Sequence, residues 1–194
     1  MSFRVALVST GGTIEKTYDE LDGMLVNEVS NLDVVLARIV LTGVSIVRVP
    51  LMNKDSRDMT EEDHDLIART AEVYSAQHDG VVIVHGTDRL ATTGNRIAEH
   101  VKPRVPVVLT GAMRPYQLRN TDAVQNVTEA LMAVQLASPG VYVALHNRLH
   151  PFPGANHARR RGTFVMEYVT VGRRSSPGSI APPPMGTYDQ WSGD

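Results

Sequence analysis

Short apolar runs recur along the chain at intervals that suit buried β-strands. Five of them are four or five residues long and rich in Val and Ile, namely residues 5–8, 44–47, 81–84, 105–109 and 141–145. Continuous apolar runs of this length are typical of strands that are buried on both faces of a parallel sheet. Segments with helical spacing lie between most of these runs. The pattern therefore predicts strands that alternate with helices.

Boundary signals locate the first two helices. Ser30 and Asp33 have the spacing of a capping box before an apolar stretch, and Gly43 is placed to end that helix as a C-cap. Thr60 begins an acidic turn that predicts the start of the second helix, and Gly80 is placed as its stop.

Two further helices are predicted over about residues 89–100 and 121–136. Alternating strands and helices are joined by right-handed crossovers in almost all known sheets. We therefore expect an α/β fold with a doubly wound, mostly parallel sheet.

Two segments break this alternation. Residues 15–28 follow the first strand and contain Asp22-Gly23, a turn pair that is typical of β-hairpins, so we expect a hairpin flap there. The stretch 173–194 is rich in Pro, Ser and Gly. We expect one domain over residues 1–172 and an irregular tail over residues 173–194.

Composition and charge remove several classes of function. The 194 residues carry 19 Lys and Arg against 21 Asp and Glu, a balance that argues against nucleic acid as the main ligand. The sequence contains no Cys, and this excludes disulfides, thiolate metal sites and a cysteine nucleophile. The spacing of His146, His150 and His157 matches no compact zinc signature, so no metal is expected. No apolar run is long enough to cross a membrane, and no signal peptide is recognised, so we expect a cytoplasmic protein.

The segments that follow the strands carry the candidate chemistry. In open α/β sheets, ligands bind beyond the carboxyl ends of the strands. Hydroxyl groups of Thr13, Ser56 and Thr87 lie in these segments, with the Asp88 carboxylate beside Thr87. A Thr hydroxyl attacks a carbonyl only when a base removes its proton, and backbone N–H groups in glycine loops can stabilise the oxyanion that forms. This combination suits acyl transfer to water.

Each segment also has a purely structural interpretation. Gly11-Gly12 could make a tight turn, Thr87-Asp88 could cap the following helix, and Ser56 could be an ordinary loop residue. Nucleotide binding by residues 9–13 is a weaker interpretation, because the segment lacks both the Walker ending and the G-x-G-x-x-G pattern.

Four motifs together resemble the bacterial-type L-asparaginase/glutaminase family. They are TGGTI (residues 10–14), SRDM (56–59), HGTD (85–88) and LTGAMRP (109–115), and the similarity in order and spacing extends over about residues 3–170. The resemblance implies that a side-chain amide, of asparagine or a related small amide, is hydrolysed to acid and ammonia without a cofactor. It also implies a small-molecule amide or amino acid as the partner, and a homo-oligomer.

The resemblance assigns roles to individual residues. It implies Thr13 as the nucleophile with Tyr18 of the flap as its partner, and Thr87 as a second threonine supported by Asp88. It implies that Ser56 holds the α-carboxylate of the substrate. The remaining substrate contacts implied by the same motifs are Gly12, Arg57, Gly86 and Ala112.

Three features depart from the family pattern. Arg89 stands where the family usually has Thr, and no lysine follows the fifth strand at the place of the family's catalytic lysine. Arg159 is the nearest match in register and His157 is a second candidate. Arg stays protonated, whereas His can act as a base near neutral pH. The chain is also short, so we expect the single-domain form without the family's C-terminal domain. The alternative function is a binding module of the same fold with impaired catalysis.

Overall fold

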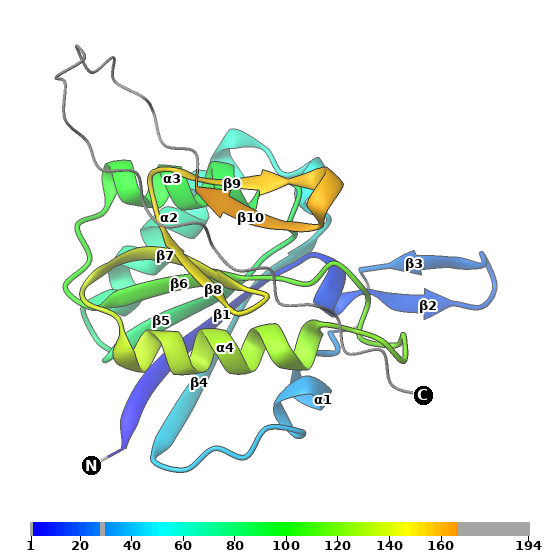
Figure 1. The fold of residues 1–194 in the computed structure, drawn as a ribbon. Helices are drawn as coiled ribbons and strands as arrows, with labels where there is room; N and C mark the ends of the chain where they lie inside the picture. The colour runs from blue at the N-terminus through cyan, green and yellow to red at the C-terminus, as the bar shows by residue number, and fades with distance from the viewer. Residues whose placement is uncertain (1, 28–29, 167–194) are drawn as a thin grey trace, which may run out of the picture.

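The computed structural model describes residues 2–27 and 30–166, and its centre is a six-stranded sheet (Figure 1). The strands lie in the order β4-β1-β5-β6-β7-β8, and all neighbours are parallel except β8, which pairs antiparallel with β7. Their bounds are β1 (Phe3–Gly11), β4 (Val44–Lys54), β5 (Gly80–Val84), β6 (Pro106–Thr110), β7 (Gly140–Leu145) and β8 (Arg148–Pro151). The predicted α/β fold with a mostly parallel sheet is confirmed.

Helices cover both faces of the sheet (Figure 1). On one face lie α2 (Glu61–Ser75) and α3 (Leu90–His100), and on the other lie α1 (Leu32–Leu36) and α4 (Ala123–Leu136). Successive residues of β1 alternate between the two cores: Ala6 and Val8 pack on the α2–α3 side, and Val5 and Leu7 on the α1–α4 side. All four are fully buried, which explains why the strand pattern is a continuous apolar run.

The expected hairpin flap is present. Strands β2 (Thr17–Asp19) and β3 (Met24–Val26) pair antiparallel and project from the edge of the domain (Figure 1). Gly23 in the connecting turn has a φ of 66°, a left-handed value that favours glycine.

The prediction for the first helix was wrong in its boundaries. The helix ends at Leu36, and Gly43 lies beyond it, where its carbonyl accepts a hydrogen bond from the backbone of Phe3. Its capping box is not formed: the N-cap is Asn31, the Ser30 hydroxyl donates to Glu15, and the Asp33 carboxylate forms an ion pair with Arg48 of β4. A tertiary ion pair thus replaces the local cap that the sequence spacing suggested.

The later helices agree better with the sequence. Thr60 and Asp63 form the reciprocal capping box at the start of α2, and α3 and α4 begin within two residues of their expected starts. The prediction that Gly80 stops the second helix was wrong: α2 ends at Ser75, and Gly80 is the first residue of β5.

The segment after β7 contains structure that the apolar pattern did not predict. Besides β8, it forms the antiparallel pair β9 (Ala155–Ala158) and β10 (Thr163–Met166), joined by a 3-10 turn at Arg159–Arg161. The expected tail over residues 173–194 lies outside the described residues. Within the described part of the chain, no helix combines the length and apolar character needed to cross a membrane.

Candidate active site

Glycines allow four of the strand-end loops to approach one another closely. Gly12 has a φ of 77°, and a Cβ placed on it would lie 2.4 Å from the backbone nitrogen of Gly86. A Cβ on Gly86 would in turn lie 2.5 Å from the Oγ of Ser56. Gly111 packs against the same group, because its Cβ would meet the Thr87 side chain at 3.1 Å. The loops after β1, β4, β5 and β6 therefore meet at one edge of the sheet, and only glycine allows contacts this close.

Threonine hydroxyls at this edge fall into two kinds. Thr10 and Thr110 are fully buried and donate to the backbone carbonyls of Val84, at 2.9 Å, and Ala144, at 2.8 Å. They have structural roles. Thr13 is half-buried and Thr87 is 7% exposed, and neither hydroxyl forms a hydrogen bond within the described part of the chain. Thr13 and Thr87 are therefore the two threonines at this edge whose hydroxyls are available to a ligand.

Asp88 lies between two basic side chains. The Arg159 Nη2 is 3.2 Å from one carboxylate oxygen, and the Arg57 Nε is 3.8 Å from the other. The alternative that Thr87-Asp88 caps the following helix is not supported, since α3 begins at Leu90 with Arg89 as N-cap and no side-chain cap bond. The Asp88 charge is instead directed into an ion-pair cluster at the sheet edge.

His157, the second candidate for the missing base, lies near the same carboxylate. Its ring stacks on Phe164 with 5.2 Å between ring centroids, and both ring nitrogens are buried without a hydrogen-bond partner among the described residues. Burial lowers the pKa of His157, and the nearby Arg159 charge acts in the same direction while Asp88 opposes it. A neutral imidazole with a free lone pair can accept a proton. The β9–β10 pair thus brings both Arg159 and His157 close to Asp88.

Asp55 organises the loop that carries Ser56, although it is not one of the residues that the motifs pointed to. Its carboxylate accepts hydrogen bonds from the Arg57 guanidinium at 2.9 Å and from Lys16 Nζ at 2.7 Å. The Arg57 hydrogen bond is the main reason that the pKa of Asp55 is held well below its usual range, with Lys16 adding to the effect. Lys16 belongs to the base of the flap, so Asp55 links the flap to the loop that carries Ser56. Ser56 itself is only 1% exposed. The sequence held one signal for this role, because an Asp directly before a short turn can cap that turn with its side chain.

A cavity of about 510 Å³ lies beside this loop, between the flap and the end of β4. Its lining residues are Lys16, Leu25, Val26, Asn27, Asn53, Lys54, Asp55, Arg57 and Asp58. Tyr18 lines a different cavity of about 520 Å³, its side chain is 57% exposed, and its N–H donates to the Gln117 side chain. The flap in this position does not bring Tyr18 together with the other candidate residues.

A second overlooked carboxylate holds the loop that contains Ala112. Asp122 accepts hydrogen bonds from the backbone N–H groups of Met113 and Arg114, both at 2.9 Å, and lies 2.7 Å from the Nε2 of His146. Burial acts to raise the pKa of Asp122, but these hydrogen bonds together lower it. Ala112 is fully buried under this loop, so it can shape the site only through its backbone.

His85 is fixed directly beneath the loop that carries Thr87. It is fully buried, its Nδ1 lies 2.8 Å from the Gly86 carbonyl oxygen, and its Nε2 lies 2.8 Å from the Thr93 hydroxyl. Burial lowers the pKa of His85 to about 4. The imidazole is therefore neutral at neutral pH.

This depressed pKa predicts acid sensitivity. The unfolded chain protonates His85 near pH 6.5, whereas the folded chain resists protonation until about pH 4, so the free energy of unfolding falls as the pH drops between these values. We expect a loss of about 3 kcal/mol from this group across that interval. Urea unfolding of the wild type and of His85→Asn at several pH values measures this loss. The free energy of unfolding of the wild type should exceed that of the variant by an amount that grows as the pH rises from 4 to 6.5. A difference that is constant with pH would contradict the assignment.

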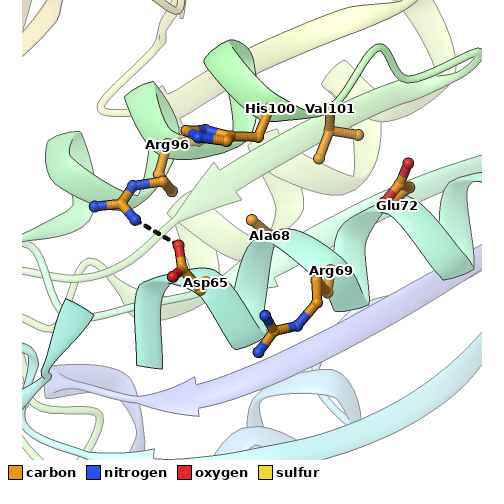
Figure 2. Close-up of a pocket in the computed structure, with 7 residues that line it drawn as sticks. All are labelled: Asp65, Ala68, Arg69, Glu72, Arg96, His100 and Val101. Carbon is orange, nitrogen blue, oxygen red and sulfur yellow. Dashed lines mark hydrogen bonds and ion pairs between the residues drawn. The ribbon is translucent and has the colours of Figure 1, made fainter. Parts of the chain in front are cut away.

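Another hollow, of about 280 Å³, lies between α2 and α3 on the helical layer (Figure 2). Arg96 turns toward Asp65 and forms an ion pair with it, while Arg69 points away from His100. The charged side chains lining this hollow therefore do not converge on a common point. The candidate active site is the edge of the sheet.

Comparisons with known proteins place the chain in a family. Residues 4–169 match the family described as asparaginase, N-terminal. An L-asparaginase of Thermococcus kodakarensis is 31% identical over 150 residues, which cover 75% of this chain and 45% of that protein. A protein of Haloquadratum walsbyi, named as a subunit of glutamyl-tRNA(Gln) amidotransferase, is 33% identical over 187 residues, which cover 95% of this chain and 41% of that protein. The chain spans less than half the length of these relatives.

Solved structures show the same fold. The thermostable L-asparaginase from Thermococcus kodakarensis superposes with a TM-score of 0.76 and 30% identity, over 84% of this chain and 51% of that one. A probable cytoplasmic L-asparaginase from Campylobacter jejuni superposes with a TM-score of 0.63 and 28% identity, over 79% of this chain and 48% of that one.

Proposed function

This chain belongs to the asparaginase family, and on that premise we propose that it is an amidohydrolase that converts a side-chain amide to acid and ammonia. One observation carries the proposal: the close approach of Gly12 to the Gly86 backbone, and of Gly86 to the Ser56 side chain, which holds the loops of three of the four family motifs together. Asparagine or a related small amide is the substrate class.

The reaction needs a nucleophile, a base and an oxyanion site. The Thr13 oxygen attacks the amide carbonyl as its proton passes to a base, the carbon–nitrogen bond breaks, and the nitrogen leaves as ammonia after taking up a proton. Water then cleaves the resulting ester and restores the hydroxyl. Backbone N–H groups of the glycine loops stabilise the negative oxygen in both steps. Thr87 and Asp88 bind and polarise the substrate, and Ser56 binds its carboxylate. Closure of the flap with Tyr18 excludes bulk water.

The base is the part of the site that departs from the family. Arg159 contacts Asp88 directly but cannot release its proton near neutral pH. His157 is half-buried, its ring nitrogens have no hydrogen-bond partner among the described residues, and its lowered pKa keeps the imidazole neutral near pH 7. We therefore assign charge neutralisation of Asp88 to Arg159, and we keep His157 as the candidate base.

Replacing Arg159 by Lys tests whether Arg159 acts in catalysis rather than in stability. The Arg159 side chain is 73% exposed, so Arg159→Lys should change the free energy of unfolding by less than about 0.5 kcal/mol. Its contact with Asp88 lies within the site, so we expect the rate of ammonia release to change severalfold. Arg160→Lys in the same turn is the matched control. If Arg159→Lys behaves like the control in both measurements, Arg159 lies outside the site and His157 alone replaces the lysine.

A second candidate function follows from the other relatives. Several proteins that are 27–33% identical to this chain are named as subunits of glutamyl-tRNA(Gln) amidotransferase. An amidotransferase passes the amide nitrogen of a donor to an acceptor, so this chain could release ammonia for such a step as one component of an assembly. A third possibility is a binding module of the same fold without turnover.

Ammonia release from a panel of amides distinguishes these candidates. The purified chain is offered L-asparagine, L-glutamine, D-asparagine and small cyclic imides, and thermal stability is measured with each. Release from free asparagine supports the amidohydrolase. Release from none, together with a higher melting temperature in the presence of one amino acid, supports the binding module. Release that requires an added partner protein supports the amidotransferase role.

A further inference from the structure

Three buried polar side chains connect α2 and α3 to the candidate active site. His64 of α2, Thr93 of α3 and His85 at the end of β5 are all fully buried, in the same layer as the core residues Ile67 and Ile97. The His64 Nδ1 lies 2.7 Å from the Thr93 hydroxyl, which lies 2.8 Å from the His85 Nε2. The two imidazole rings are stacked with 6.3 Å between their centroids.

The chemistry of the groups gives this chain of hydrogen bonds a single direction. The Gly86 carbonyl can only accept, so the His85 Nδ1 must carry a proton and donate it. With His85 neutral, its Nε2 is then an acceptor, and the Thr93 hydroxyl donates to it. The Thr93 oxygen in turn accepts from a protonated Nδ1 on His64. Both histidines are thus held as Nδ1–H tautomers. If the hydrogen bonds ran the other way, the chain would end on a protonated Nε2 of His64, which has no acceptor among the described residues.

The relay ends on the peptide bond that leads into Thr87. The Gly86 carbonyl and the Thr87 N–H belong to one planar, trans peptide unit, so fixing the carbonyl also fixes the direction of that N–H. The N–H therefore points away from the His85 ring. The backbone of Gly86 also contacts Gly12 and Ser56, so a rotation of this peptide would disturb the candidate active site as a whole.

Packing alone does not require polar side chains at these three positions. Burying two imidazoles and a hydroxyl costs stability that apolar residues of similar size would not cost. The Nε2 of His64 has no hydrogen-bond partner among the described residues, which adds to this cost. Nearly all polar groups of this network are hydrogen-bonded, and its hydrogen bonds can run in only one direction. Such a buried network specifies a single local conformation.

We propose that His85, Thr93 and His64 form a directional relay that positions the Gly86–Thr87 peptide for amide hydrolysis. His64 and Thr93 act as positioning residues, because neither lies at the candidate substrate. The proposal rests on the proposed amidohydrolase function for its kinetic consequence. Its hydrogen-bond pattern can be measured without any activity.

The matched variants are Thr93→Val, which removes the hydroxyl at nearly constant shape, and Thr93→Ser, which keeps it. We expect Thr93→Val to lower kcat roughly fivefold to tenfold, the effect of one lost hydrogen bond, with KM changed less than about twofold. Thr93→Ser should restore most of kcat. A Thr93→Val variant with the kcat of the wild type would overturn the positioning role.

A second pair of variants covers the case in which Thr93→Val does not fold. His64→Asn keeps an N–H donor close to the position of Nδ1, and His64→Leu removes it. The relay predicts a higher kcat for His64→Asn than for His64→Leu, and equal values would overturn it.

Nitrogen-15 NMR of the histidine side chains tests the relay independently of catalysis. The relay predicts Nδ1–H tautomers for both His64 and His85 in the wild type at neutral pH, and loss of that preference at His64 in Thr93→Val. An Nε2–H tautomer at His85 in the wild type would overturn the relay. If the tautomers are as expected but no amide is hydrolysed, the proposed function fails while the relay stands.

Discussion

Replacing Thr13 by Ala is expected to abolish ammonia release while leaving the fold intact. Thr13 supplies the attacking oxygen in the proposed reaction, and removing a nucleophile typically lowers kcat by roughly a thousandfold or more. The side chain is half-buried, and its hydroxyl forms no hydrogen bond within the described chain. The free energy of unfolding should therefore change by less than about 1 kcal/mol. Initial rates and urea unfolding measure the two effects separately.

Two controls make this prediction specific. Thr13→Ser retains a hydroxyl and should retain measurable turnover. Thr10→Ala removes a hydroxyl that is bound to the Val84 carbonyl, so it should lower stability more than Thr13→Ala does. Full activity in Thr13→Ala would show that another group attacks the amide.

Replacing Gly12 by Ala is expected to lower both stability and activity, far more than the same change at Gly43. Both glycines have positive φ values, 77° and 76°, which cost an added Cβ about 1–2 kcal/mol of backbone strain, and the ψ of −167° also places Gly12 in a region that essentially only glycine occupies. At Gly43 nothing lies within 4 Å of the new Cβ, whereas at Gly12 it meets the Gly86 backbone at 2.4 Å. Relieving that overlap adds about 1–3 kcal/mol and separates the two loops.

Unfolding and kinetics of the two variants measure the difference. We expect Gly12→Ala to lose at least about 1 kcal/mol more stability than Gly43→Ala, and most of its turnover, because the overlap is with backbone. Gly43→Ala should keep the kcat of the wild type. Equal behaviour of the two variants would mean that the Gly12–Gly86 contact does not organise the site.

The fold was largely predictable because its signals are local. The strands around Val5 to Val8 are covered on both faces, and this produces continuous apolar runs that stand out in the sequence. The capping box at Thr60 is likewise a local pattern, and the structure forms it. Asp33 shows the limit of such patterns: the same spacing was present, but its carboxylate pairs with Arg48 on a strand far along the sequence.

The candidate site was only partly predictable, because its supports come from distant segments. The motif residues could be found from their resemblance to a family, since they lie in short, compact blocks after strands. Asp122 could not, and Asp55 offered only its position before a short turn, because the importance of both depends on segments that fold back onto them. The β9–β10 pair was also missed: its strands contain polar residues such as Asn156 and His157 and lack the apolar runs of the central sheet. These short strands nevertheless bring Arg159 to Asp88.

Amide hydrolysis by this chain is tested by measuring ammonia and the acid product together, from the purified chain with L-asparagine and with L-glutamine. Hydrolysis with Thr13 as the nucleophile should yield ammonia and the acid in equal amounts with at least one of the two amides, and neither product with Thr13→Ala. Ammonia release that is the same in the wild type and in Thr13→Ala would rule out Thr13 as the nucleophile, and binding of both amino acids without any product would rule out their hydrolysis.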